Sequence, residues 1–151
     1  MTIDPMKVWA NMSLKTWPER YWMIDLGLEQ ASAAVAAIMH SEARYSCIIR
    51  DQAGLSLVVD DETWVIHGVS VTERDRFGPF RIVSTDGELP FNVIGFLRPV
   101  LEELNGAGIK AGPQCGAVFD HLFIFEKDIE RAQIILENFI VQAQELSQRG
   151  E

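Results

Sequence analysis

One carboxylate in this sequence lies within an apolar segment, where a charged side chain is unusual. Asp120 is in the middle of the apolar segment AVFDHLFIF, residues 117–125. Alternation along a strand places Asp120 on the same face as Leu122 and Ile124, which is otherwise apolar. An unpaired buried charge is strongly disfavoured, so Asp120 needs a cationic partner. We expect this partner to be either a ligand ammonium or an internal side chain, Arg81 or Lys110.

A second polar feature lies between an apolar run and a predicted helix, in the segment TDGELPFN, residues 85–92. Asp86 and Glu88 are acidic, and Gly87 allows close approach of the backbone to a ligand. The following segment predicts a helix, whose first N–H groups have no partner within the helix and suit an anion. A carboxylate near free N–H groups is the arrangement that a zwitterion requires.

We therefore predict a binding site for a small zwitterionic ligand, an amino acid. The predicted ligand contacts are Asp120, Phe119, Val118, Glu88, Leu89, Phe91 and Gly95. Two of the polar residues near this site also have simpler interpretations. Glu88 has the composition of a solvated turn, and His121 is more often a core or interface histidine than a ligand contact.

Other chemistry finds little support in the sequence. His40, His67 and His121 have no metal-ligand spacing with one another or with the cysteines, and Asp60–Glu62 is most simply a solvated turn. Neither a phosphate-binding loop nor a dinucleotide fingerprint occurs. We therefore expect no catalytic residues, no metal and no cofactor.

The amino-acid composition and net charge argue against some classes of binding partner. The chain has 151 residues, is 48% hydrophobic and carries a formal net charge of -9, with no cluster of lysine or arginine. Nucleic acid and anionic membrane surfaces are therefore unlikely partners. No apolar run approaches the ~20 residues that span a bilayer. We expect a cytoplasmic protein in which Cys47 and Cys115 are reduced and buried.

Hydrophobic periodicity, together with the glycines and prolines that interrupt it, predicts a series of strands and helices. Strands are predicted at residues 20–26, 43–51, 55–61, 80–85, 109–114 and 117–125, with a further short strand at 63–69. Helices are predicted at residues 28–40, 92–105 and 128–148, with a short amphipathic helix within 1–17. The polar segment SVTERDRFGP, residues 70–79, has the composition of a linker.

These elements predict an α+β fold built from two ferredoxin-like units (βαββαβ) in tandem, with antiparallel sheets that carry helices on one face. The predicted divisions are an N-terminal helical extension at 1–17, a first unit at 18–76 and a second unit at 77–151. On the last helix, Ile134 and Val141 form a second, narrower apolar stripe. This stripe is consistent with core packing or with a homodimer.

The sequence resembles the ACT domain, a small ligand-binding module of amino-acid metabolism. The resemblance lies in DGELPFNVIGFLRPVLEELNGAGI, then AVFDHLFIF and EKDIERAQIILENF, and less specifically in DQAGLSLVVDDE. It is strongest to small bacterial proteins with two ACT-like units, which are related to the cytosolic arginine sensors of animals. The resemblance implies two ACT-type units, amino-acid binding at the interface between units, no catalysis and frequent dimers.

The sequence departs from this family pattern just before the Asp120 strand. Many relatives have small hydroxyl residues there, whereas this chain has Pro113-Gln114-Cys115-Gly116. A hydroxyl contact to a ligand carboxylate is therefore in doubt, although Gly116 retains a backbone N–H. Pro99 is also unusual inside the predicted helix, and Gly95 four residues earlier leaves room for its ring.

Three functions are compatible with these observations. The first is a non-catalytic regulatory module that binds an amino acid between units. The second is an obligate dimeric interaction subunit whose ligand site is empty. The third is a small phosphoryl-group hydrolase, which is disfavoured because Asp86 and Glu88 would repel phosphate and because Cys115 has no activating base nearby in the sequence.

Overall fold

A computed structural model describes residues 2–150. Residue 1 of the predicted range 1–17 and residue 151 of the predicted range 77–151 therefore lie outside the described residues. The chain forms two compact units. Unit 1 consists of Met1–Thr16 and Val83–Glu151, and unit 2 consists of Trp17–Ile82. Unit 2 is thus inserted into unit 1, whereas the predicted ranges place one unit after the other.

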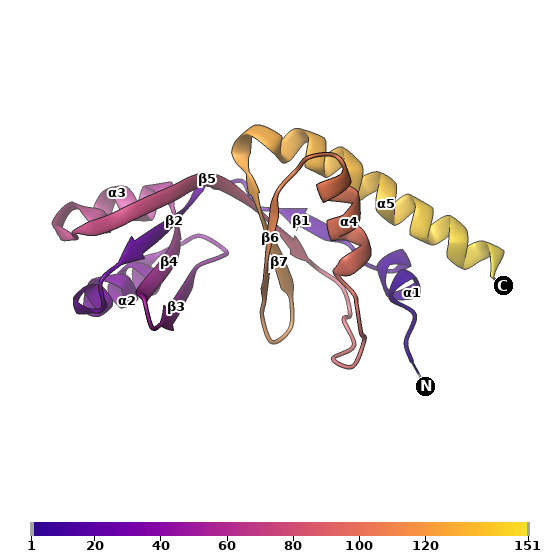
Figure 1. Cartoon of the computed structure of the whole chain (residues 1–151), viewed down its shortest axis with the longest axis horizontal. Coiled ribbons are helices and arrows are strands. Elements are labelled where there is room, and N and C mark those ends of the chain that lie inside the picture. The colour runs from indigo at the N-terminus through magenta and orange to yellow at the C-terminus, as the bar shows by residue number, and fades with distance from the viewer. Residues whose placement is uncertain (1, 151) are drawn as a thin grey trace. The chain divides into compact units, whose positions relative to one another are not determined.

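Unit 2 contains four antiparallel strands and two α-helices (Figure 1). Its elements are β2 (Tyr21–Leu26), η1 (Leu28–Gln30), α2 (Ala31–His40), β3 (Cys47–Asp51), β4 (Gly54–Asp60), α3 (Asp61–His67), η2 (Gly68–Ser70) and the greater part of β5 (Glu73–Thr85). The strand order is β3-β4-β2-β5. The helix and the hairpin predicted over residues 28–61 are confirmed.

The core of unit 2 lies between its sheet and its helices. The buried side chains are Ile24, Leu26, Ala34, Ala37, Leu55, Leu57, Val59 and Trp64. The alanines of α2 give the helix a high intrinsic propensity and a thin surface that packs closely on the sheet. Gly54 begins β4 with φ +130°, which an L-residue rarely adopts and glycine tolerates.

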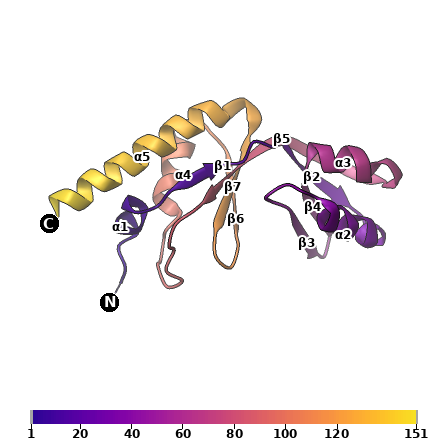
Figure 2. The same ribbon diagram turned by 180° about the vertical axis from the view of Figure 1, so that it is seen from behind.

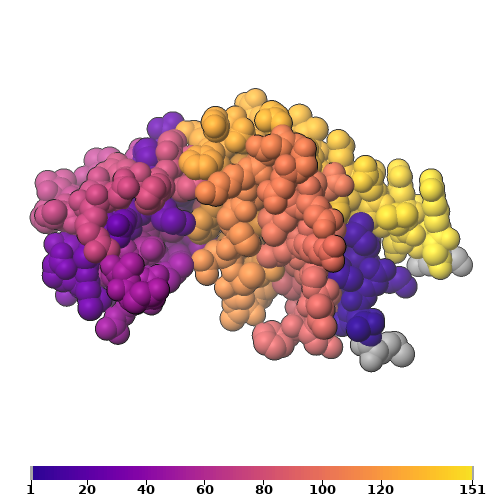
Figure 3. Space-filling model, in the orientation of Figure 1, coloured from indigo at the N-terminus to yellow at the C-terminus, as the bar shows by residue number. Residues whose placement is uncertain are grey.

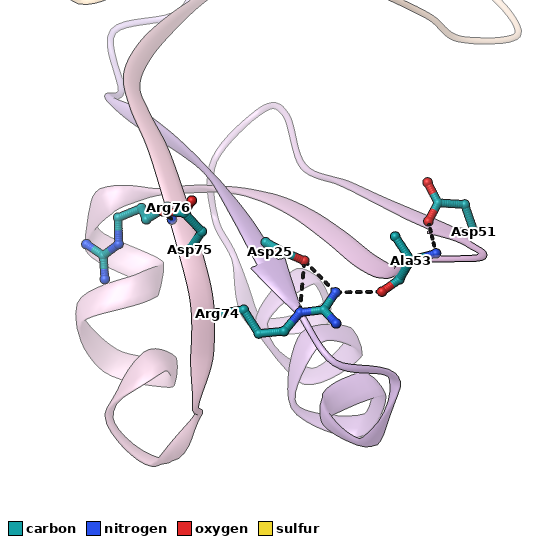
Figure 4. Close-up of polar contacts among 6 residues, drawn as sticks. All are labelled: Asp25, Asp51, Ala53, Arg74, Asp75 and Arg76. Carbon is teal, nitrogen blue, oxygen red and sulfur yellow. Dashed lines mark hydrogen bonds and ion pairs between the residues drawn. The ribbon is translucent and has the colours of Figure 1, made fainter.

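The predicted linker at residues 70–79 is wrong, because most of it belongs to β5 (Figure 4). Arg74 holds this part of β5 in place. Its guanidinium donates to Asp25 Oδ1 (3.2 and 2.7 Å) and to the Ala53 carbonyl (2.6 Å). Gly78-Pro79 coincides with a register irregularity against β2, where the missing N–H of proline does not break a regular ladder. Ion pairs and hydrogen bonds across strands thus override a polar, proline-containing composition.

The strand predicted at 63–69 is also wrong, since this segment forms α3 and η2. Asp60 caps α3 by accepting a hydrogen bond from the Thr63 N–H (3.0 Å). Asp61 and Glu62 lie in the first turn, where negative charge is favourable. These helix-start signals outweigh the β-branched residues that suggested a strand.

Unit 1 combines the N-terminal segment with the C-terminal half of the chain. Its elements are α1 (Pro5–Ala10), β1 (Leu14–Thr16), the end of β5, α4 (Arg98–Gly106), β6 (Ala111–Cys115), β7 (Asp120–Phe125), η3 (Glu126–Asp128) and α5 (Ile129–Arg149). The strand order is β1-β5-β7-β6, and α1 lies beside α5 in both ribbon views (Figures 1 and 2). The predicted mixture of antiparallel strands and helices is confirmed.

The two units share one order of strands. In unit 2, β2, β3, β4 and β5 follow one another along the chain, and the fourth strand pairs with the first. In unit 1, β1 occupies the position equivalent to that fourth strand, with Leu14 opposite Thr85 and Thr16 opposite Val83. Unit 1 therefore takes its last strand from the beginning of the chain.

The N-terminal helix observed in the structure, α1, covers only Pro5–Ala10 of the predicted range 1–17. Its buried side chains belong to the core of unit 1. Trp9 has no exposed surface, and its ring stacks on Phe96 with centroids 4.2 Å apart. The Trp9 indole also donates to the Phe96 carbonyl (2.6 Å) and meets Phe139 edge-on at 5.3 Å. These contacts bind residues near the amino terminus to α5 and to the loop that precedes α4.

The helix predicted at 92–105 begins later, at Arg98. Pro99 therefore lies in the first turn of α4, where a missing N–H removes no helical hydrogen bond. Because Gly95 is not part of α4, the Pro99 ring does not need the room that a glycine four residues earlier in a helix would provide. Gly95 lies before the helix with φ +74°, so its role is in the loop.

Two further expectations concern single side chains. Cys47 is half-buried and Cys115 is exposed, which corrects the expectation that both are buried; both thiols are free. On α5, Ile134 and Val141 are 59% and 50% exposed, so the second stripe does not pack in the core of the described chain. No helix among residues 2–150 is long and apolar enough to cross a membrane.

Trp9→Ala should reduce the free energy of unfolding of unit 1 by about 3–5 kcal/mol, because it removes a fully buried ring and leaves a cavity. Chemical denaturation followed by circular dichroism measures this loss. Met39→Ala, at a side chain that is 75% exposed on α2, provides a control that should change stability by less than about 0.5 kcal/mol. A loss below about 1 kcal/mol for Trp9→Ala would mean that the N-terminal segment does not belong to the core.

Candidate functional site

A small pocket of about 210 Å³ lies in unit 1, between the loop before α4 and the turn that joins β6 to β7. Figure 3 shows these two segments as neighbouring surfaces. The pocket is lined by Leu89, Pro90, Phe91, Val93, Phe96, Cys115, Gly116, Ala117, Val118 and Asp120. Asp120 is the one side chain among these residues that carries a charge at neutral pH.

The position of Asp120 follows from the sheet. It is the first residue of β7 and pairs with Cys115 on β6, while its N–H donates to Thr85 Oγ1 (2.9 Å). Alternation along β7 places it on the side of Leu122 and Ile124, which are 3% and 0% exposed. Asp120 itself is 8% exposed, so the sequence correctly predicts that it is not a surface residue.

Asp120 has no cationic partner in the part of the chain that the structure describes. Arg81, one expected partner, donates instead to the Trp17 carbonyl (3.1 and 2.8 Å). Lys110, the other, forms no ion pair with Asp120 within residues 2–150. Of the three partners expected for Asp120, the ligand ammonium is the one that these contacts leave open.

Cys115 is the polar neighbour of Asp120. Although Cys115 is an exposed residue, partial desolvation of its thiol, followed by hydrogen bonding to Asp120 and the negative charge of the Asp120 carboxylate, raises the pKa of that thiol. The thiol therefore stays protonated at neutral pH and is a poor nucleophile. This arrangement argues against nucleophilic chemistry at Cys115, as the sequence suggested.

His121 does not line the pocket, in agreement with its interpretation as a core residue. Its Nδ1 lies 2.7 Å from Ser84 Oγ on the neighbouring strand. Burial lowers the pKa of His121, although the nearby charge of Asp120 acts in the opposite direction. The imidazole is therefore mainly neutral at pH 7 and does not serve as a cation for Asp120.

Four of the seven predicted contacts line one pocket, namely Leu89, Phe91, Val118 and Asp120. The other three, Glu88, Phe119 and Gly95, are not among its lining residues. The sequence analysis missed Pro90, Val93, Phe96, Cys115 and Ala117. Cys115 pairs with Asp120 across the β6–β7 hairpin. Knowledge of this register would have placed the thiol beside the predicted binding residue.

The polar backbone groups of the pocket differ from those expected. Because α4 begins at Arg98, its free N–H groups do not follow residues 86–91 directly. The N–H of Gly116 is also occupied, since it donates to the Phe119 carbonyl (2.9 Å). Among residues 2–150, the N–H groups of Leu89, Phe91 and Val118 donate no hydrogen bond, and all three residues line the pocket.

A second pocket, of about 410 Å³, lies in unit 2 and has a different character. Its walls include Glu19, Glu42 and Glu62, together with His40 and His67, whose rings stack at 5.4 Å. No group of three or more potential metal ligands is positioned for a metal within residues 2–150. The acidic side chains of this pocket are therefore not arranged as a metal site within the described residues.

The buried carboxylate of this second pocket is satisfied by its own chain. Asp60 is 5% exposed and accepts hydrogen bonds from Ser41 Oγ (2.8 Å), Thr63 Oγ1 (2.6 Å) and the Thr63 N–H (3.0 Å). Burial acts to raise the pKa of Asp60, but the hydrogen bonds together lower it below its usual value. Asp60 is a structural carboxylate, unlike Asp120.

Comparisons with known proteins establish the fold. A Vibrio cholerae protein of unknown function, described as a possible transport protein, is 19% identical and superposes with a TM-score of 0.64, covering 89% of this chain and 94% of its own. An Agrobacterium tumefaciens protein is 21% identical with a TM-score of 0.65, over 86% and 90% of the two chains.

The regulatory subunit of aspartate kinase from Thermus flavus superposes with a TM-score of 0.57 at 10% identity, covering 85% of this chain and 96% of its own. This chain has an ACT-like fold. No family model and no curated protein matches the sequence itself. The likeness thus lies in the arrangement of elements, and at these identities it extends no further than the fold.

Asp120→Asn should lower the pKa of Cys115 and so raise the fraction of reactive thiolate, because the substitution removes a negative charge beside the thiol. We expect Cys115 to react with iodoacetamide several-fold faster at pH 8, as measured by peptide mass spectrometry. Cys47 in the same molecule is the internal control and should keep its rate. Equal rates for Cys115 in both proteins would contradict the interaction.

Asp60→Asn should destabilise unit 2 by roughly 1–3 kcal/mol at pH 7, because three donors lose a charged acceptor. The folded pKa of Asp60 lies below its unfolded value of about 3.9, so this stability is present above that pH and lost as the pH falls through the folded pKa. Urea unfolding at pH 7 and at pH 3 should show the difference between the two proteins shrinking. A difference independent of pH would contradict an ionised Asp60.

Proposed function

We propose that this chain is a non-catalytic regulatory module that binds an amino acid in the unit 1 pocket. The observation that carries the proposal is the Asp120 carboxylate, which is buried, lines the pocket and has no cationic partner among residues 2–150. The solved structures with this fold include regulatory subunits of aspartate kinases, which supports a regulatory role.

The ligand ammonium would bind at Asp120. A carboxylate removed from water is unfavourable alone, and a cation held at hydrogen-bond distance offsets that penalty. The backbone of Asp120 is held by β7 and by the hydrogen bond from its N–H to Thr85, so the main chain at this position loses little conformational freedom on binding. The site is therefore organised in advance for an amine.

The ligand carboxylate would bind backbone N–H groups of lining residues, and those of Leu89, Phe91 and Val118 donate no hydrogen bond within residues 2–150. Backbone N–H groups in a turn form anion-binding concavities without a positively charged side chain. Such a site suits a zwitterion better than a free anion, because the net charge of -9 and the nearby Asp120 repel an uncompensated negative charge.

Regulation would follow from differential affinity. A ligand that prefers one arrangement of the chain shifts its population by that preference and by no more. The exposed residues Ile134 and Val141 on α5 support association with a second copy of the chain. The cytoplasmic location remains a prediction from the composition of the sequence. The position of the ligand at an interface between units and the relationship to arginine sensors remain predictions from the resemblance.

Thermal shift against a panel of amino acids tests the proposal. At about 100 times its dissociation constant, a true ligand should add roughly 2.7 kcal/mol to the unfolding free energy. For a chain of this size this corresponds to a rise of several degrees, at about 2–4 °C per kcal/mol. Asp120→Asn should abolish the shift and leave the melting temperature of the free protein unchanged or higher.

Asp75→Asn is the matched control, because it makes the same substitution at an exposed residue of unit 2. It should retain the full ligand-induced shift. A large loss of stability in free Asp120→Asn would instead identify Asp120 as a structural residue. No response to any amino acid from a correctly folded protein would favour the alternative of an interaction subunit with an empty site.

A further inference from the structure

The walls of the unit 1 pocket carry information about the ligand beyond its amine. Apart from Asp120 and Cys115, each side chain that lines the pocket is apolar, and Gly116 has none. Phe96 forms a buried part of the wall at 5% exposure, and its ring is held by stacking on Trp9. This side of the pocket is therefore apolar and fixed before any ligand binds.

The mouth of the pocket is apolar as well. Phe91 is fully exposed at 101%, and Val118 is 67% exposed. Both line the pocket, so a ligand with an apolar group would cover part of their surface and remove it from water. Removal of apolar surface from water is favourable in proportion to its area. A ligand that offered only polar atoms here would gain nothing from these two side chains.

Within residues 2–150, the pocket lining offers no lysine or arginine to a second ligand carboxylate. Lys15 pairs with Asp86 (3.0 Å), and Arg98 pairs with Glu102 (2.9 Å). None of the lysines and arginines among residues 2–150 lines the pocket. The side-chain carboxylate of an acidic amino acid would therefore lie near Asp120 without a counter-charge, which is unfavourable.

A basic amino acid meets the opposite difficulty. Its α-ammonium would occupy Asp120, the one charged side chain in the lining, and its second cation would face Leu89, Val93 and Phe96. The cost of removing that cation from water would have no compensating ion pair. A ligand with a single ammonium matches the single carboxylate.

We infer that the pocket selects amino acids with uncharged, apolar side chains, such as leucine or phenylalanine. This inference rests on the proposed function, since it assumes that the ligand ammonium binds Asp120. The volume of about 210 Å³ is consistent with so small a ligand and excludes a nucleotide held wholly within it.

Isothermal titration calorimetry with leucine, phenylalanine, glycine, aspartate and lysine tests the inference on the full chain. Leucine or phenylalanine should bind at least tenfold more tightly than the other three. If aspartate or lysine binds most tightly, the selectivity is wrong and the proposed function stands. If glycine binds as tightly as leucine, the apolar wall contributes nothing and the inference fails. If none binds, both the inference and the proposed function fail.

Val118→Arg adds a cation at the mouth of the pocket and should reverse the preference. We expect it to weaken leucine binding at least tenfold and to strengthen aspartate binding. Val65→Arg on α3 is a matched control, since Val65 is likewise 67% exposed and lies in unit 2; it should bind like the unaltered protein. Unchanged binding in Val118→Arg, with melting temperature and circular dichroism intact, would place the ligand elsewhere and overturn the inference.

Discussion

The contact between Trp9 and Phe96 joins the N-terminal segment of unit 1 to the loop that precedes α4. The loop from residue 86 to 97 has no regular helix or strand to hold it. Instead it is fixed by the N-terminal segment, because Trp9 stacks on Phe96 and donates to its carbonyl (2.6 Å). At its other end, Ser13 Oγ donates to the Asp86 carbonyl (2.6 Å) and Lys15 pairs with the Asp86 side chain. The pocket wall thus depends on residues some 80 positions away in the sequence.

The same dependence on distant residues explains how far the fold follows from the sequence. The strand composition of residues 20–26, the hairpin of β3 and β4, and the apolar stripe of α5 are local patterns, and each predicts its element correctly. β1 has only three residues and gains its strand conformation from pairing with the end of β5, which no local pattern shows. The insertion of unit 2 into unit 1 therefore could not be predicted without knowing that pairing.

The incorrect elements have a related physical cause. Residues 73–79 have a polar composition, but the ion pair of Arg74 with Asp25 and the ladder with β2 make them a strand. Residues 63–67 have β-branched side chains, yet the cap from Asp60 makes them a helix. Residues 92–97 have helical spacing, but α4 begins only at Arg98. In the first two cases a specific hydrogen bond or strand pairing outweighs a propensity worth less than about 1 kcal/mol per residue.

The two buried aspartates show which part of the site the sequence could indicate. Asp60 is the last residue of β4 and Asp120 is the first residue of β7, and both are more than nine-tenths buried. From sequence alone, Asp60 reads as a solvated turn and Asp120 as a binding residue. Only the structure shows that Asp60 is satisfied by Ser41 and Thr63, whereas Asp120 has no cation. Burial of a carboxylate therefore does not by itself identify a binding residue, and the identity of its partners does.

The surroundings of Asp120 also connect the pocket to the strand that both units contain. The Asp120 N–H donates to Thr85 Oγ1, and Thr85 is the last residue of β5. Residues 73–82 of that strand belong to unit 2 and residues 83–85 to unit 1. The next residue, Asp86, is bound through its backbone and side chain to Ser13 and Lys15. Asp120 is therefore hydrogen-bonded to the end of a strand whose residues are divided between the two units.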